Sequence, residues 1–155
     1  MNAMASWAAN RRGAALVEFA IVVMLLLTIV LGTIEFGALA LTQLTLTQGA
    51  REGSREASLG RPVATIETRV RSAAGLLQEE QIIVTETYST DNGATFPVTL
   101  GNNTDGTENN APLGSLIQIH CEYPYSLITG NFFSWFTGAE NGVLTLRTSV
   151  IMRRE

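Results

Sequence analysis

The sequence predicts an α+β protein, with a long N-terminal helix that includes a transmembrane segment, followed by a second helix and a small antiparallel sheet of about four strands. Two observations predict this fold class. The apolar residues are concentrated in the first third of the chain, and the later part contains one helical pattern followed by several short alternating runs. A membrane element and one small domain are therefore the natural division of the 155 residues.

The first helix contains the longest uncharged apolar run of the chain. No charged residue lies between Phe19 and Ile34, and the apolar character resumes after Glu35, so the helix reaches the roughly 20 residues that a bilayer core requires. Arg11 and Arg12 precede the run without an acidic residue nearby. The positive-inside rule therefore predicts a cytoplasmic N-terminus and a single-pass protein whose C-terminal domain lies outside.

Three interpretations of this segment differ in the role of its acidic residues, Glu18 and Glu35. In a secretory signal peptide, the sequence ALA at residues 38–40 would be the cleavage site, but both acids are unusual in such a peptide. In a plain anchor, the two acids would lie at the membrane interfaces. In the third interpretation the chain is cut after Gly13, which gives Ala14 a new α-amino group on the same helix face as Glu18, four residues later. When such helices bundle, Glu18 of one subunit can neutralise the Ala14 amine of its neighbour and set their register.

The residues around the proposed cut favour the third interpretation. Gly13 is followed by four small or apolar residues and then by Glu18 and Phe19, a pattern that resembles the type IVb prepilin processing site. The segment from Gly13 to Gly37, with its second acid in GTIEFG, more narrowly resembles the TadE-like pseudopilins of the Tad (tight adherence) pilus and secretion system. The sequences TQGAREGSREAS after the helix and LTLRTSVIMRRE at the end of the chain are similar to the corresponding parts of that family.

This resemblance implies an assembly protein, a minor pilin or pseudopilin, rather than an enzyme. Residues 1–13 would be a leader peptide removed by a prepilin peptidase, residues 14–60 the long helix, and residues 61–155 an exported α+β domain. The helix would be stored in the bacterial inner membrane and then join other pilin subunits through the pilus assembly machinery, with Glu18 and Phe19 setting the register. The domain after the helix implies a minor component, because the major type IVb pilin is little more than the helix. The alternative is an unprocessed, membrane-anchored binding module or adhesin.

Glu35 allows two interpretations. The carboxylate could lie at the outer membrane interface, where water reaches it, or it could contact another pilin helix and contribute to the register. The sequence does not decide between them.

Glycine and proline set the predicted helix boundaries of the outer domain. Gly49, Gly53 and Gly60 weaken the first helix, so we expect it to fray or bend and to end near Gly60. Pro62 suits the first turn of a second helix, whose apolar positions between Val63 and Leu77 follow one face.

Short alternating runs predict the strands, which we expect at residues 82–87, around 96–98, at 115–125 and at 142–155. The sequence Asp91-Asn92-Gly93 predicts a hairpin turn between the first two strands, and Pro97 restricts the second strand to an edge. The polar segment 101–112 has no apolar anchor before Ala111, and we expect it to be a mobile surface loop.

Four aromatic residues lie close together in a predicted loop: Phe132, Phe133, Trp135 and Phe136. They could fold back onto the sheet, or they could form an exposed patch for a partner pilin or for the membrane interface.

Composition argues against several other classes of protein. The net charge is −4 and no basic stripe is present, which argues against a nucleic-acid partner. The chain has one cysteine, Cys121, and one histidine, His120; strand alternation sends these to opposite faces, with Cys121 expected to be buried. We therefore expect no catalytic residues, no metal, no cofactor and no small-molecule substrate.

Overall fold

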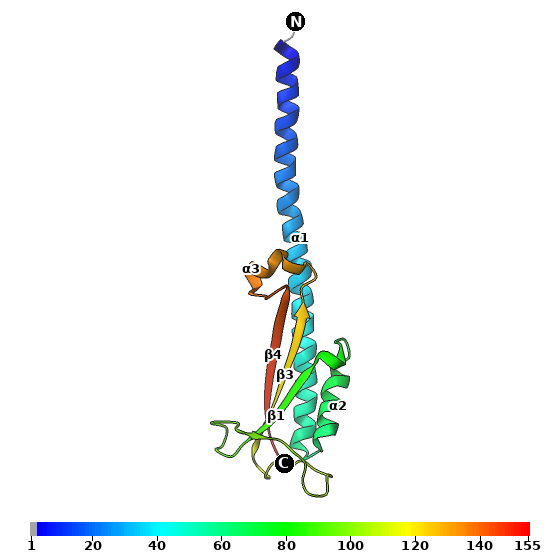
Figure 1. Ribbon diagram of the computed structural model, residues 1–155, viewed down its shortest axis with the longest axis vertical. Helices are drawn as coiled ribbons and strands as arrows, with labels where there is room; N and C mark the ends of the chain where they lie inside the picture. Colours follow the sequence, from blue (N-terminus) through cyan, green and yellow to red (C-terminus); the bar gives the residue numbers. More distant parts are fainter. Residues whose placement is uncertain (1–2) are drawn as a thin grey trace. The chain divides into compact units, whose positions relative to one another are not determined.

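The computed structural model describes the backbone of residues 3–155, and the side chains of that range except those of residues 3–12, 133, 135 and 136. It confirms the α+β fold, with a long N-terminal helix, a second helix and a four-stranded antiparallel sheet (Figure 1). The elements are, in chain order, α1 (Ala3–Ser58), α2 (Val63–Ala73), η1 (Glu79–Gln81), β1 (Ile83–Ser89), β2 (Val98–Thr99), β3 (Leu116–Ser126), η2 (Gly130–Phe133), α3 (Ser134–Thr137) and β4 (Val143–Arg153).

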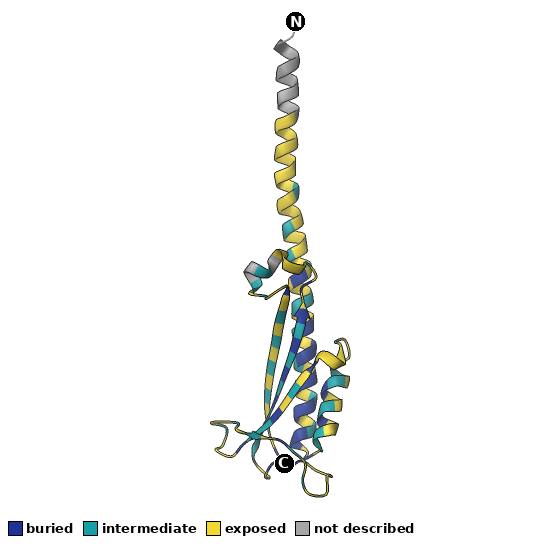
Figure 2. Ribbon diagram, viewed as in Figure 1, coloured by how far each residue is buried: buried dark blue, intermediate teal, exposed yellow. Residues whose placement is uncertain are grey.

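The chain divides into two compact units, Met1–Gly37 and Ala38–Glu155. Helix α1 contributes to both of them. In the first unit its described side chains are mostly exposed, whereas in the second unit one of its faces is buried (Figure 2). The boundary between the two environments therefore falls within one continuous helix.

The expected fraying at the glycines of α1 is wrong, because α1 continues through them to Ser58. A Cβ atom on Gly49 would lie 2.8 Å from the carbonyl oxygen of Val70, and one on Gly53 would lie 2.2 Å from Val70 Cγ2. Only glycine allows α2 to approach so closely at these two positions. The cost of glycine in a helix is therefore offset by packing between the helices.

Gly60 ends α1 as expected. Its φ of 79° is left-handed, its N–H donates to the carbonyl of Ala57 (3.0 Å), and the N–H of Arg61 donates to the carbonyl of Glu56 (3.1 Å). These two bonds form a Schellman motif. Glycine is favoured in it because glycine has no Cβ that would clash in the left-handed conformation.

Helix α2 starts one residue later than the sequence suggested. Pro62 has extended backbone angles and precedes the helix, so it is the N-cap and not the first helical residue. Its side chain accepts no hydrogen bond. The exposed N–H of Val63 instead donates to Oδ1 of Asn102 (2.9 Å), from the segment that follows β2.

The four strands form an antiparallel sheet in the order β2-β1-β3-β4. Strand β2 lies at an edge, as Pro97 predicted. The alternation expected for residues 115–125 is confirmed by burial in β3, where every second side chain faces the core. Ile117, Ile119 and Cys121 pack in one apolar cluster with Ile66 and Val70 of α2.

The segment 101–112 is exposed for most of its length, as expected of a surface loop, but it is anchored near its end by a polar residue that the sequence did not indicate. Asn109 is buried, and its Nδ2 donates to the carbonyls of Ala57 (3.0 Å) and Arg61 (3.1 Å) at the end of α1. An asparagine can hold a loop in this way without any apolar contact, because its amide nitrogen donates to backbone carbonyls at and beyond the helix end.

Arg154 completes this anchor from the C-terminal end of the chain. It is buried, and its Nη1 donates to the carbonyls of Asn109 (2.8 Å) and Ala111. Its Nη2 lies 2.8 Å from the carboxylate of Glu108. The guanidinium therefore holds the loop that Asn109 in turn links to the end of α1.

Candidate assembly surface

The first unit consists of helix whose described surface is almost entirely apolar. The described part of α1 is long and apolar enough to cross a membrane, and none of its most apolar 18-residue window is buried. Large apolar side chains are exposed on all sides of the helix. They are Leu16, Val17, Phe19, Ile21, Val22, Met24, Leu25, Leu26, Leu27, Ile29, Val30, Leu31, Ile34 and Phe36. Such a surface is stable only against lipid or against other apolar helices.

The residues of the proposed processing site lie within α1. Gly13, Ala14 and Glu18 are exposed, and a Cβ atom on Gly13 would meet no atom within 4 Å. Glu18 follows Ala14 by four residues, so both lie on one face of the helix. Arg11 and Arg12 belong to α1, but their side chains lie outside the described ones.

Glu35 differs from Glu18 in burial. Its relative exposure is 0%, whereas Glu18 is exposed. This burial does not fit the interpretation in which water reaches the carboxylate at a membrane interface. Its role in setting the register stays a prediction.

The aromatic segment forms short helical turns, η2 and α3, instead of an irregular loop. Phe132 exposes 52% of its surface. The side chains of Phe133, Trp135 and Phe136 lie outside the described residues, so the aromatic patch stays a prediction.

Cys121 and His120 lie on opposite faces of β3, as the alternation predicted. Cys121 is buried, and burial together with the nearby Glu86 raises the pKa of its thiol to about 12 against the opposing effect of Arg71. A thiol that stays protonated is a poor nucleophile. His120 instead lies 3.3 Å from Glu122, which also pairs with Arg147 at 3.0 Å.

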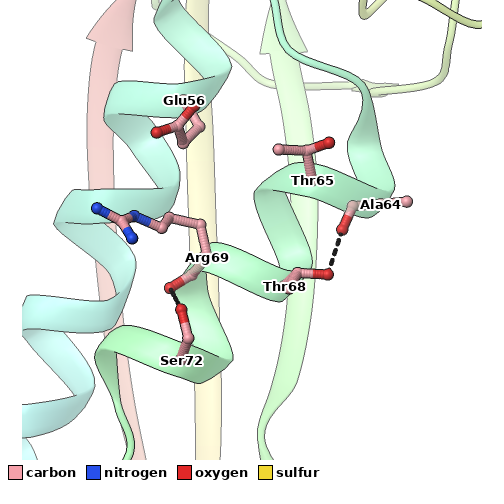
Figure 3. Close-up of a pocket in the computed structure, with 6 residues that line it drawn as sticks. All are labelled: Glu56, Ala64, Thr65, Thr68, Arg69 and Ser72. Carbon is pink, nitrogen blue, oxygen red and sulfur yellow. Dashed lines mark hydrogen bonds between the residues drawn. The ribbon is translucent and has the colours of Figure 1, made fainter.

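A shallow groove runs between α1 and α2 within the second unit (Figure 3). Its lining residues are Glu56, Ala64, Thr65, Thr68, Arg69 and Ser72. Thr68 and Ser72 donate their hydroxyl hydrogens to carbonyls of α2, and Arg69 extends toward α1, where it lies 3.6 Å from Glu52. Thr68, Arg69 and Ser72 therefore take part in contacts within the fold. Among the described residues, no group of three histidine, cysteine or acidic side chains could hold a metal ion.

Glu86 is an acidic residue in the core whose burial we did not expect from the sequence. It is 6% exposed, and its Oε1 has no hydrogen-bond partner. Burial raises the pKa of this carboxyl from 4.5 to about 7, and repulsion from Glu67 adds to the rise, while a backbone hydrogen bond and Arg71 oppose it. The signal was present in the alternation of β1, because Glu86 has the same parity as Val84 and Tyr88, which pack against the core.

Comparison with known proteins bears on the apolar helix α1. Residues 13–55 match the model of the family described as TadE-like protein. This match confirms the resemblance seen in the sequence, and it supports a pilin-related role for a membrane-anchored chain. It begins at Gly13 and ends before the end of α1. No curated protein and no solved structure matches the chain.

Proposed function

We propose that the chain is a minor pilin or pseudopilin that takes part in the assembly of a Tad (type IVb) pilus. The observation that carries the proposal is the change of environment along α1. Its residues 13–37 expose an apolar surface, and its residues 38–58 are built into an α+β domain. The family match over residues 13–55 supports the same role.

In this proposal the chain is inserted in the bacterial inner membrane with its N-terminus in the cytoplasm. A prepilin peptidase cuts after Gly13, and residues 1–13 are lost as a leader peptide. The mature helix of residues 14–60 then joins other pilin subunits, while residues 61–155 stay outside. The work of the protein is assembly, and it requires no cofactor.

The charge of Glu18 guides the assembly step. A carboxylate within an apolar bundle costs roughly 2.5 to 3.5 kcal/mol near the centre of a membrane unless it is paired. The α-amino group of Ala14, created by the cut, supplies the partner on a neighbouring subunit. Phe19 packs beside this pair, and the exposed Phe132 with the other aromatics of its segment offers a further contact for a partner pilin.

The N-terminal residue of the protein purified from its own membranes tests the processing step. We expect intact mass and Edman sequencing to identify Ala14. Gly13→Val should leave the chain uncut, and it is a clean control because a side chain there would meet no other atom within 4 Å. An intact Met1 in the unaltered protein would contradict the proposal and would favour an anchored binding module or adhesin. A new terminus near residue 40 would indicate a secreted domain.

Glu18→Ala tests the assembly step. We expect the variant to insert and to be cut, but to be lost from sheared filaments or from co-purified pilin complexes, because the amine of its neighbour has no partner. Glu18→Asp should be intermediate, since the same charge reaches less far. Glu140→Ala, which removes an exposed acid of the outer domain, is the matched control and should assemble normally. Normal assembly of Glu18→Ala would show that the charge pair between Glu18 and the Ala14 amine does not guide assembly.

A further inference from the structure

Helix α1 has an exposed face within the second unit. Leu41, Leu44, Gln48, Arg51 and Arg55 follow one another at three- and four-residue steps, and all five are exposed. Leu44 exposes 63% of its surface. The opposite face of the same helix is buried against α2 and the sheet. These five residues, which we call the α1 stripe, begin apolar and end basic.

The two arginines of the α1 stripe differ from other arginines near them. Arg61 pairs with Glu56 at 3.9 Å, and Arg69 pairs with Glu52 at 3.6 Å. For Arg51 and Arg55, no acidic group lies within 4.0 Å in the part of the chain that the structure describes. Two cations one turn apart on a helix repel each other, and no acidic side chain offsets this repulsion in the α1 stripe.

The turn after α2 has the complementary character. Leu76 is 77% exposed, and Glu79 and Glu80 follow it as exposed acids without an ion pair among the described side chains. The turn is held in place by Arg71, whose Nη1 donates to the carbonyls of Glu79 and Ile82. We call Leu76, Glu79 and Glu80 the acidic turn; its apolar and acidic side chains complement the apolar and basic side chains of the α1 stripe.

We propose that the α1 stripe of one subunit binds the acidic turn of a second copy of this chain. Leu76 lies against Leu44, and Glu79 and Glu80 pair with Arg51 and Arg55. This inference rests on the proposed function, since it describes how outer domains meet in an assembly. Because the two surfaces are made of different residues, the contact is heterologous, and each subunit can offer both surfaces at once.

Disulfide cross-linking between two tagged copies of the full-length protein in its own membranes tests this contact. One copy carries Gln48→Cys and the other carries Leu76→Cys. The native Cys121 is buried and does not compete. We expect a mixed disulfide dimer after mild oxidation, and little product when both copies carry Gln48→Cys or both carry Leu76→Cys.

Charge reversal then tests the pairing. Arg51→Glu with Arg55→Glu on the first copy should lower the cross-linked yield roughly fivefold or more, as expected for close interfacial charge pairs. Glu79→Arg with Glu80→Arg on the second copy should restore it. Arg153→Glu, at an exposed arginine outside the stripe, is the matched control and should leave the yield unchanged.

Two results would overturn the inference: an unchanged yield on charge reversal, or cross-linking of Gln48→Cys to a different protein and not to Leu76→Cys. The N-terminal residue is determined in the same samples. An Ala14 terminus with no cross-link would overturn this contact and leave the proposed function standing, whereas an intact Met1 would contradict the proposed function itself.

Discussion

The two halves of α1 differ in burial although they form one continuous helix. Residues 13–37 carry large side chains such as Leu25 and Ile29, which are exposed on the chain itself. Residues 38–58 carry small side chains on the face that meets α2, among them Gly49 and Gly53, and these are buried. Hydrophobicity therefore does not measure burial in this protein: the more apolar half is the more exposed one.

The two halves of α1 are stabilised by different surroundings. A large exposed apolar surface is stabilised by lipid or by neighbouring helices, so the first half depends on its surroundings. The second half depends on close contact with α2, because glycine lets the two backbones approach. Substitutions in the first half should change assembly, and those in the second half should change folding.

The largest effect is expected for Gly53→Leu. A Cβ at this position would already lie 2.2 Å from Val70 Cγ2, and Val70 cannot yield easily because a β-branched side chain is restricted at χ1. We expect the free energy of unfolding to fall by about 3 kcal/mol or more, by overpacking. Chemical unfolding of the full chain in detergent, followed by near-ultraviolet circular dichroism, measures the change.

Gly37→Leu is the matched control for this substitution. A Cβ on Gly37 would meet no atom within 4 Å, so we expect the unfolding of the outer domain to change little. Equal losses in the two variants would show that the loss at Gly53 does not arise from contact with α2, because leucine has the higher helix propensity at both positions.

The elements that the sequence predicted well are those whose pattern is local. The apolar run, the alternation of β3 and the edge position of β2 follow from neighbouring residues, and each was confirmed. The continuity of α1 could not be predicted in this way. Gly49 and Gly53 have low helix propensity, and only their contact with Val70, far along the chain, explains why the helix passes through them.

The polar contacts show the same limit more strongly. Nothing near Asn109 in the sequence indicates that it pairs with the end of α1, and nothing near Arg154 indicates that it binds two carbonyls of a distant loop. The family resemblance that begins at Gly13 was recognisable because its residues are adjacent in the sequence. A motif made of contiguous residues can be recognised from sequence, and a buried network assembled from three segments cannot.

The second prediction concerns Glu86, whose carboxyl has a pKa raised to about 7 by burial. Between pH 4.5 and about 7 the folded chain keeps this proton while the unfolded chain has lost it, so stability falls as the pH rises through this window. The total loss is up to roughly 3 kcal/mol, at about 1.4 kcal/mol per pKa unit, and no further loss from this group occurs above it. Glu86→Gln should remove the decline and be more stable than the unaltered protein at pH 8.

Unfolding curves at several pH values between 4 and 8 measure this slope for both proteins. Glu140→Gln, at an exposed position, should retain the slope of the unaltered chain. Parallel curves for Glu86→Gln and the unaltered protein would mean that the Glu86 carboxyl titrates normally in the folded state.

The third and smallest effect is expected for Arg154→Met, which tests how the buried half of α1 is closed. Methionine fills much of the space but leaves the carbonyls of Asn109 and Ala111 without their donor, and an unsatisfied buried group costs about 1 to 3 kcal/mol. We therefore expect the free energy of unfolding to fall by roughly 2 kcal/mol. The loss of the Glu108 ion pair adds little, because Glu108 is exposed and regains water when its partner is removed. Arg153→Met is the neighbouring control on an exposed position and should be nearly neutral. If both variants lost equal stability, the loop 101–112 would be held by Asn109 alone, and the guanidinium would contribute only its general charge.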